Sequence, residues 1–223
     1  MHHCFIIGVA GGSGSGKSTV TKHIVEAIGS ENVAVIMQDY YYNDLSNLTV
    51  SQRNNINFDH PDALDLALMK KQLNDLYHGL PVHIPEYDFT QHMRLTTTKL
   101  VLPAKVIIVE GIFALYDEDI CNQMSLRIFV DTAADIRLMR RLRRDLIERN
   151  RTLESVIKQY TQFVRPMYQK FVEPTKRKAH IIIPHGSNKA ALEMIVSRIQ
   201  SVLNGQQINV DAIIPCDDDT FDV

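Results

Sequence analysis

The sequence predicts an α/β fold in which five parallel strands form an open, doubly wound sheet with helices on both faces. Two observations lead to this prediction. Five short runs of apolar, mainly β-branched residues alternate with segments in which apolar residues recur at helical spacing. The 223 residues are 45% hydrophobic and 22% charged, which suits one substantial globular core. Strands covered on both faces are typically continuous apolar runs, as these are.

The elements follow in order along the chain. The expected strands are Phe5–Val9, Val33–Met37, Val106–Val109, Leu126–Val130 and Ile181–Ile183. A first helix is expected after the glycines that follow the first strand, because apolar residues from Val20 to Ile28 recur at helical spacing. Further helices are expected at about 62–78, 133–148, 152–171 and 188–203.

Two segments depart from this alternation and are therefore candidates for function. Residues 40–61 are polar and aromatic, and residues 81–103 have the alternating pattern of a β-hairpin. Residues 1–204 are expected to form one domain. Residues 205–223 contain five Asp and no Lys or Arg, which predicts a flexible acidic tail.

Composition limits the classes of partner. The net charge of −2 provides no overall positive field for nucleic acid or an anionic membrane. The three cysteines are widely spaced and form no metal or disulfide pattern, which favours a reducing compartment. The apolar run at the start is far shorter than a membrane span. The sequence therefore predicts a soluble, cytoplasmic protein.

The motif GGSGSGKS at 11–18 fits G-x-x-x-x-G-K-[ST] and lies between an expected strand and an expected helix. This context predicts a P-loop NTPase fold, because glycines allow backbone N–H groups to surround phosphate oxygens. A glycine-rich turn with a chance lysine is the alternative. The expected nucleotide-binding residues are Gly11, Gly12, Ser13, Gly14, Ser15, Gly16, Lys17, Ser18 and Thr19.

Three side chains are expected near Mg²⁺ at this edge of the sheet. The Ser18 hydroxyl is one ligand expected from the motif, and Glu110 ends the third apolar strand at the same edge. Asp39, which follows the second strand, is the third. An alternative role for Glu110 is to cap the next helix. A GTPase is disfavoured because Asn188-Lys189-Ala190-Ala191 lacks the acid of an NKxD guanine motif.

Asp39 is also the candidate general base, because a carboxylate facing the γ-phosphate can accept the proton of an acceptor hydroxyl. The alternative is an aspartate that begins a turn. Aromatic residues gather in the two departing segments and suit a flat, hydrogen-bonding ligand, although they could simply pack the loops. Asp59 could bind this ligand or cap a helix that begins near Pro61.

Seven arginines lie between 137 and 151, and those at 137, 140, 141 and 144 share one helical face. Such a face predicts a lid, at about 137–152, that closes on phosphates and neutralises transition-state charge. A nucleic-acid surface and a merely solvated face are the alternatives. Acidic residues interrupt the run, which weakens the first of these.

The chain resembles the uridine kinase (uridine-cytidine kinase) family from the first strand to about Leu203. The segments that carry the resemblance are GGSGSGKS at 11–18, QDYYY at 38–42, NFDHPDA at 57–63, YDFTQHMR at 87–94, VEG at 109–111, VDTAADIRLMRRLRRDLIERNR at 130–151 and QYTQFVRPMYQKFVEPTKRKAHIIIP from Gln159. Several of them have no role in a generic P-loop protein. This favours the family over phosphoribulokinase and pantothenate kinase, its relatives.

The resemblance implies transfer of the γ-phosphoryl group of ATP (or GTP) to the 5′-hydroxyl of uridine or cytidine, giving UMP or CMP. It implies that Asp39 is the base, that Lys17, Arg144 and Arg149 assist transfer, and that the enzyme uses Mg²⁺. The residues that would line the nucleoside site are Tyr42, Phe58, Asp59, Tyr87, Phe89, His92, Arg141, Arg151 and Gln159.

The resemblance also implies a homotetramer with small-molecule substrates and neither nucleic acid nor membrane as a partner. Two residues depart from the family pattern: Asn150 replaces a usual glycine, and Glu86 replaces a usual apolar residue. Asparagine adopts left-handed conformations readily, so Asn150 predicts little loss of lid mobility. Another small-molecule kinase and a nucleotide-dependent switch or nucleic-acid ATPase are the alternative functions.

Overall fold

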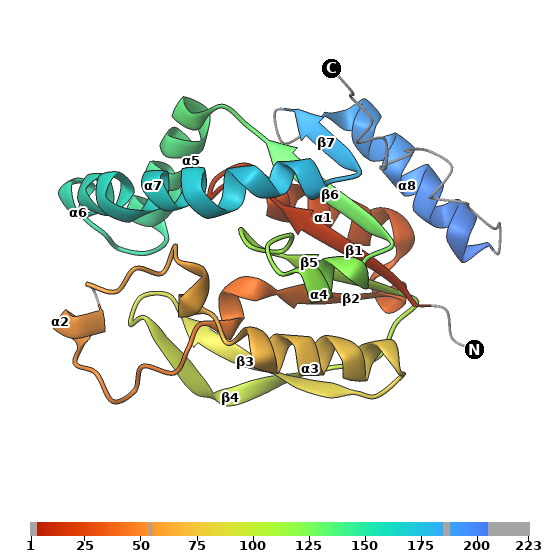
Figure 1. Ribbon diagram of the computed structural model, residues 1–223, viewed down its shortest axis with the longest axis horizontal. Helices are drawn as coiled ribbons and strands as arrows, with labels where there is room; N and C mark the ends of the chain where they lie inside the picture. The colour runs from red at the N-terminus through yellow and green to blue at the C-terminus, as the bar shows by residue number, and fades with distance from the viewer. Residues whose placement is uncertain (1–3, 54, 185–187, 205–223) are drawn as a thin grey trace, which may run out of the picture.

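The computed structural model describes residues 4–53, 55–184 and 188–204, and it confirms the predicted five-stranded parallel sheet. The strand order is β2-β5-β1-β6-β7, so the first strand lies at the centre (Figure 1). The strands are β1 (Phe5–Ala10), β2 (Val33–Met37), β5 (Val106–Glu110), β6 (Leu126–Asp131) and β7 (Ile181–Pro184). Each begins and ends within a residue of its prediction.

Two apolar clusters cover the two faces of this sheet. On one face, helices α1 (Lys17–Ile28) and α8 (Lys189–Leu203) pack on β1, β5 and β6. On the other face lie α3 (Leu66–Tyr77), α4 (Glu118–Asn122) and a two-stranded hairpin. All five residues of β5 are buried, as its continuous apolar sequence predicts.

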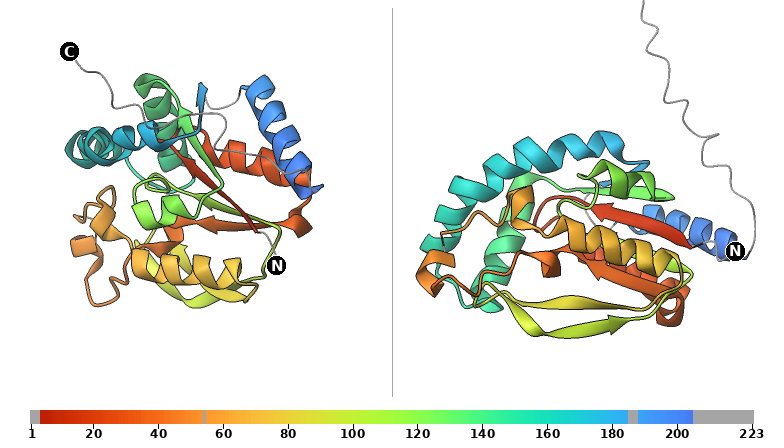
Figure 2. Two further views of the ribbon diagram at one scale, coloured as in Figure 1. Left: turned by 45° about the vertical axis from the view of Figure 1, so that its right-hand side comes forward. Right: turned by 60° about the horizontal axis from the view of Figure 1, so that its bottom comes forward.

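The predicted hairpin consists of β3 (Val82–Asp88) and β4 (Met93–Val101), which pair antiparallel in a separate sheet (Figure 2). The register shifts between Pro85 and Tyr87, so Glu86 lies at a bulge. In the connection between the two strands, His92 has a φ of 50°, a left-handed conformation that non-glycine residues seldom adopt.

The chain between β2 and α3 contains three short helical turns, which are η2 (Gln38–Tyr41), α2 (Val50–Arg53) and η3 (Pro61–Ala63). Buried Arg53 holds this connection to the hairpin, because its guanidinium donates to the carbonyls of Leu48 at 2.7 Å and Gln91 at 3.0 Å. Helix α3 begins later than predicted, since the Asp65 carboxylate caps it by accepting from Leu68 N–H.

The arginine-rich segment forms α5 (Ala134–Ile147), close to the predicted 133–148. The helix predicted over 152–171 is only partly regular. It begins as α6 (Leu153–Gln159) and continues through π-helical turns on both sides of α7 (Arg165–Met167) before a final 3₁₀ turn, η6 (Glu173–Lys178). The π-helical turns are η4 (Tyr160–Val164) and η5 (Tyr168–Val172). Figure 2 shows that this whole stretch curves over the molecule as one rod.

Four further points complete the description of the fold. Asn188, which begins the segment compared with a guanine motif, caps α8 by accepting from Ala191 N–H at 3.2 Å. Another short 3₁₀ turn, η1 (Ser30–Asn32), precedes β2. The predicted tail at 205–223 lies outside the described residues. Within the described ranges, none of the helices has the length and apolar character needed to cross a membrane.

Candidate active site

The glycine-rich segment joins β1 to α1 at the carboxyl edge of the sheet. Helix α1 begins at Lys17 after Gly16, whose left-handed conformation has a φ of 102°, and no side chain caps its first turn. The N–H groups of that turn therefore remain available to an anion. The buried Ser15 hydroxyl also makes no hydrogen bond within the described chain. These features suit a phosphate group.

Two glycines of this loop have no space for a side chain. Gly14 has a φ of +78°, and a Cβ atom there would lie 2.5 Å from the carbonyl oxygen of Arg137. A Cβ on Gly12 would lie 2.2 Å from the Arg137 guanidinium, which in turn stacks 3.8 Å from the Tyr168 ring centroid. The loop is therefore packed between α5 and the π-helical turn η5. Glycines at positions 12 and 14 allow Arg137 and Tyr168 to lie directly against the loop backbone.

The candidate metal ligands Ser18 and Glu110 lie side by side. The Ser18 hydroxyl donates to Glu110 Oε1 at 2.5 Å. Helix α4 is capped by Asp117 rather than Glu110, so the capping role considered for Glu110 is wrong. Burial lowers the pKa of Lys17, while the carboxylates of Asp39 and Glu110 oppose that shift. The ammonium group therefore lies in the field of both acids.

Strand register explains why these groups meet. Glu110 is aligned with Met37 of β2 on one side and with Val9 of β1 on the other. Asp39 and the glycine-rich loop follow those strands directly, so all three emerge at one edge of the sheet. Asp39 lies in the first turn of η2, so its backbone does take part in a turn.

One cavity of about 50 Å³ brings together the predicted acceptor groups and the glycine-rich loop. All nine residues predicted to contact the nucleoside line it, together with the predicted base and both predicted lid arginines. Ser13 of the loop and Ile112, which follows β5, complete the wall. The lining consists of Ser13, Asp39, Tyr42, Phe58, Asp59, Tyr87, Phe89, His92, Ile112, Arg141, Arg144, Arg149, Arg151 and Gln159.

Aromatic rings form one side of this cavity and also pack on one another. Tyr42 contacts Phe58 and Tyr87, with 5.2 Å between ring centroids in each pair. Phe58 stacks on His92 with a centroid distance of 4.6 Å. Packing and ligand lining are thus compatible roles for the same rings. The Tyr87 hydroxyl is buried and makes no hydrogen bond within the described residues, so a polar group is available toward a ligand.

Not all aromatic residues of the departing segments reach the cavity. Tyr41 is fully buried in the core, where its hydroxyl donates to Gln72 at 2.7 Å. Tyr40 packs on Phe89. His60 caps η3 and packs on Phe171, so the capping role considered for Asp59 is wrong.

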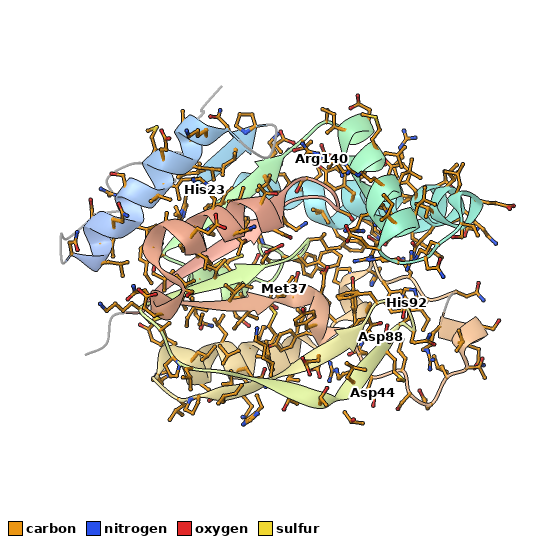
Figure 3. The ribbon with its side chains drawn as sticks, turned by 180° about the vertical axis from the view of Figure 1, so that it is seen from behind. His23, Met37, Asp44, Asp88, His92 and Arg140 are labelled. Atoms are coloured by element: carbon orange, nitrogen blue, oxygen red, sulfur yellow. The ribbon has the colours of Figure 1, made fainter. Side chains whose placement is uncertain are left out.

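His92 lies where the hairpin faces the lid helices (Figure 3). Its Nε2 atom is 2.8 Å from Nη2 of Arg151, whose Nη1 donates to the Gln159 side chain. Burial and the nearby cations Arg151 and Arg149 lower the pKa of His92 to about 4. The ring is therefore neutral at physiological pH.

Two carboxylates inside the cavity oppose its positive charge. Burial raises the pKa of Asp59, and the nearby Asp39 charge adds to this shift, whereas Arg141 and Arg144 oppose it. On the opposite side, Arg149 stacks 4.9 Å from the Phe89 ring centroid. Carboxylates, guanidinium groups and aromatic faces together suit a ligand that combines a sugar, a flat base and a site of phosphorylation.

The arginine face predicted on α5 points at the glycine-rich loop. Arg140 donates to the carbonyls of Gly14 and Ser15, and Arg141 and Arg144 approach the Ser13 hydroxyl at 3.0 and 3.4 Å. Arg137 and Arg141 are buried, so the interpretation of the whole face as merely solvated is wrong, although Arg140 itself is exposed. Figure 3 labels Arg140 on this helix, beside the loop.

Sequence reasoning missed two residues of the site. Asp145 is one of the acidic residues that interrupt the arginine run, and in the structure it is the buried partner of four arginines. The sequence signal that could have identified Asp145 is a single acidic residue within a run of arginines on one helix. Ile112 was also missed, although it lies two residues beyond Glu110 at the same edge.

A second cavity of about 400 Å³ adjoins the first. The two share His92, Arg149, Arg151 and Gln159, so the first (inner) and second (outer) cavities are neighbours. The contacts of Arg151 with His92 and Gln159 lie in the lining that the two cavities share. The inner cavity alone is smaller than the roughly 300 Å³ of ordinary small-molecule pockets.

Comparisons with known proteins agree with this arrangement. Residues 6–191 match the Phosphoribulokinase / Uridine kinase family. A uridine kinase from Deinococcus deserti is 52% identical over 200 residues, which cover 89% of this chain and 97% of the relative. A uridine kinase from Staphylococcus carnosus is 51% identical over 208 residues, covering 93% of this chain and all of the relative.

Solved structures share the fold at low sequence identity. A putative fructose transport system kinase from Silicibacter sp. TM1040 aligns with a TM-score of 0.66 and 18% identity, covering 82% of this chain and 90% of that one. Phosphoribulokinase from Rhodobacter spheroides aligns with a TM-score of 0.58 and 13% identity, covering 82% of this chain and 71% of that one.

Proposed function

Because the chain belongs to the phosphoribulokinase / uridine kinase family, we propose that it is a uridine and cytidine kinase that phosphorylates the 5′-hydroxyl with ATP. The observation that carries this proposal is the composition of the inner cavity. Ser13 of the phosphate loop, the Asp39 carboxylate and the aromatic and arginine side chains all line the same space. Phosphate donor and nucleoside acceptor can therefore meet there.

The donor side consists of the loop, the α1 N-terminus and Lys17. ATP phosphates would accept hydrogen bonds from the free N–H groups, and the Lys17 ammonium would neutralise the β and γ oxygens. Ser18 and Glu110 offer a hydroxyl and a carboxylate oxygen, which fit Mg²⁺ because that ion is commonly held by one or two such side chains plus phosphates. When bound, the ion would screen phosphate charge. ATP and GTP both satisfy these contacts.

The acceptor side depends on Asp39. A hydroxyl group held in line with the γ-phosphate loses its proton as the new P–O bond forms, and the Asp39 carboxylate would accept that proton. The P–O bond to the β-phosphate breaks at the same time, with ADP as the leaving group. Arg144 and Arg149 line the same cavity and would stabilise the charge on the transferred group.

The nucleoside itself would be held by the remaining lining residues. The Asp59 carboxylate and the Arg151 guanidinium are an acceptor and a donor for ribose hydroxyls. Tyr87, His92 and Arg141 would contact the edge of the base, while Tyr42, Phe58 and Phe89 pack on it and Gln159 holds the arginines.

The test is an assay with labelled ATP and a panel of acceptors: uridine, cytidine, other nucleosides, pantothenate and ribulose phosphate. Label is expected on uridine and cytidine as the 5′-monophosphates. Label confined to pantothenate or ribulose phosphate would instead assign another small-molecule kinase. ATP hydrolysis stimulated by a nucleic acid, without a labelled small product, would assign a nucleotide-dependent switch.

The predicted setting of the enzyme follows the same proposal. A nucleoside kinase needs ATP and free nucleosides, so we place it in the cytoplasm, in keeping with its dispersed cysteines. The homotetramer implied by the family resemblance remains a prediction, and analytical ultracentrifugation would test it.

A further inference from the structure

We propose that Asp145 is a positioning residue that gathers four lid arginines and holds them in the cavity wall, with Arg144 and Arg149 available to the transferred phosphate and Arg141 and Arg151 to the nucleoside. This inference rests on the proposed kinase function and adds a residue that does not line the cavity. Asp145 would act through the arginines, since other side chains separate its carboxylate from any substrate.

The carboxylate of Asp145 is fully buried and is the centre of a cluster of guanidinium groups. Arg144 makes the closest contact, because its Nε donates to Oδ1 at 2.9 Å. The full set of ion pairs is Arg141 Nε to Oδ2 at 3.4 Å, Arg144 Nη2 to Oδ1 at 2.9 Å, Arg149 Nη1 to Oδ1 at 3.6 Å and Arg151 Nη1 to Oδ2 at 3.8 Å.

Asp145 connects helix α5 to the turn that follows it. Arg141 and Arg144 belong to α5, whereas Arg149 and Arg151 lie in the turn before α6. The chain reverses at Asn150, which has a φ of 50°, and Arg151 N–H then donates to the Asp145 carbonyl at 3.1 Å. Asp145 therefore holds the turn to the helix through both its backbone and its side chain.

The cluster carries more positive charge than its single carboxylate neutralises. Four guanidinium groups surround one acid, which leaves a surplus near the cavity. Repulsion among the groups is evident in Arg149, because burial and then the Arg144 charge lower its pKa. Burial alone would raise the pKa of Asp145, but Arg141, Arg144 and Arg149 lower it, so the acid stays ionised. The carboxylate is the group that keeps these like charges together.

The other edges of the same arginines face the site. Arg141 and Arg144 approach the Ser13 hydroxyl in the phosphate loop, and Arg151 contacts His92 and Gln159. All four guanidinium groups thus line the cavity and also lie within ion-pair distance of Asp145. Because charge stabilisation in a transition state depends on fixed geometry, the loss of this anchor should reduce the rate of transfer. ATP binding should persist, since the positive charges remain.

The first experiment compares Asp145→Asn with Asp135→Asn. Asp135 is an exposed acid on the same helix and belongs to none of the ion pairs of the described chain. With uridine and ATP, Asp145→Asn should lower kcat by about 100-fold, whereas KM for ATP should change by less than roughly threefold. Asp135→Asn should match the wild type. Wild-type kcat in Asp145→Asn would overturn the proposal.

A second variant covers the case in which Asp145→Asn does not fold. Asp145→Glu retains the charge but displaces it by one methylene group, so kcat should fall by roughly tenfold with nearly unchanged KM for ATP. If kcat, ATP affinity and melting temperature fall together in both variants, the residue is structural and the positioning role is wrong. A fall in kcat without a matching loss of ATP affinity is the expected result, and a merely structural role would not produce it.

A third measurement does not depend on the proposed reaction. Limited digestion with trypsin, followed by mass spectrometry, reports the accessibility of Arg149 and Arg151. Cleavage after these residues should be about tenfold faster in Asp145→Asn than in Asp135→Asn, because the anchor is lost. If the wild type phosphorylates no nucleoside but this difference is found, the proposed function fails and the anchoring role stands. Equal cleavage would overturn the anchoring role.

Discussion

His92 shows how a single side chain acquires a defined chemical state from its neighbours. A guanidinium group can only donate hydrogen bonds, so the 2.8 Å contact with Arg151 makes His92 Nε2 an acceptor. In the neutral ring the proton is then on Nδ1. The structure favours this tautomer over the other because Arg151 lies against Nε2. The resulting Nδ1–H is a donor suited to an acceptor such as O4 of uracil or N3 of cytosine.

This state has a measurable pH dependence. The pKa of His92 in the fold is about 4, below the roughly 6.5 of a free histidine. As the pH falls below about 6.5, the unfolded chain takes up a proton first, so the free energy of unfolding decreases between pH 6.5 and 4. An NMR titration should show no midpoint for the His92 ring between pH 8 and 5, and His92→Gln should identify its signal. A midpoint near 6.5 would contradict the buried, arginine-bound geometry.

Asp39 offers a direct test of the base role. Asp39→Asn removes the proton acceptor but changes the side-chain volume little, so kcat should fall by about 10²–10⁴-fold. The dissociation constant for ATP, measured by titration calorimetry, should stay within roughly threefold of the wild-type value. Asp44→Asn, at an exposed site in the same connection, is the matched control. Unchanged turnover in Asp39→Asn would remove this residue from the mechanism.

At the scale of elements, apolar periodicity predicts the strands well because buried parallel strands require continuous apolar runs. The rod after the lid was less predictable. The apolar pattern over 152–171 suggested a regular helix, but η4 and η5 are π-helical, and η5 carries Tyr168 against Arg137 beside the phosphate loop. Such turns depend on tertiary contacts and are frequent at functional sites, so a local pattern does not reveal them.

The turn between α5 and α6 depends on a left-handed backbone conformation at Asn150, and the asparagine in the sequence predicts that conformation. Asn150 has a φ of 50°, as expected for a residue that replaces glycine. Asn150→Gly should change the free energy of unfolding by only a few tenths of a kcal/mol, whereas Asn150→Val should lower it by about 1–2 kcal/mol. Urea denaturation measures both variants. Equal stability of Asn150→Val and the wild type would show that the turn tolerates another conformation.

At the scale of the whole molecule, the site exists because distant segments converge. Its lining comes from the glycine loop, η2, the segment before η3, the hairpin and the lid. Motifs and family resemblance predicted most of these residues, because each occurs in a distinctive segment. Asp145 escaped prediction because its importance lies in burial and in contacts with four arginines, which become visible only when α5 and the following turn are placed together.

Ligand binding should stabilise the entire fold. A ligand that binds only the native state at 100 times its dissociation constant adds about 2.7 kcal/mol to the free energy of unfolding. For a chain of this size, that corresponds to a rise in melting temperature of roughly 5–10 °C. A thermal-shift assay should show this rise with uridine and cytidine. Pantothenate at the same concentration is the control, and a rise with pantothenate alone would contradict the nucleoside assignment.

The contacts of Arg151 with His92 and Gln159 have a consequence for the rates of nucleoside binding and product release. Because the inner cavity of about 50 Å³ is smaller than ordinary ligand pockets, binding and release of a nucleoside would require lining side chains such as Arg151 to move. The same side-chain movement would then be needed for nucleoside binding and for product release. The rate of turnover can therefore be limited by this movement rather than by phosphoryl transfer.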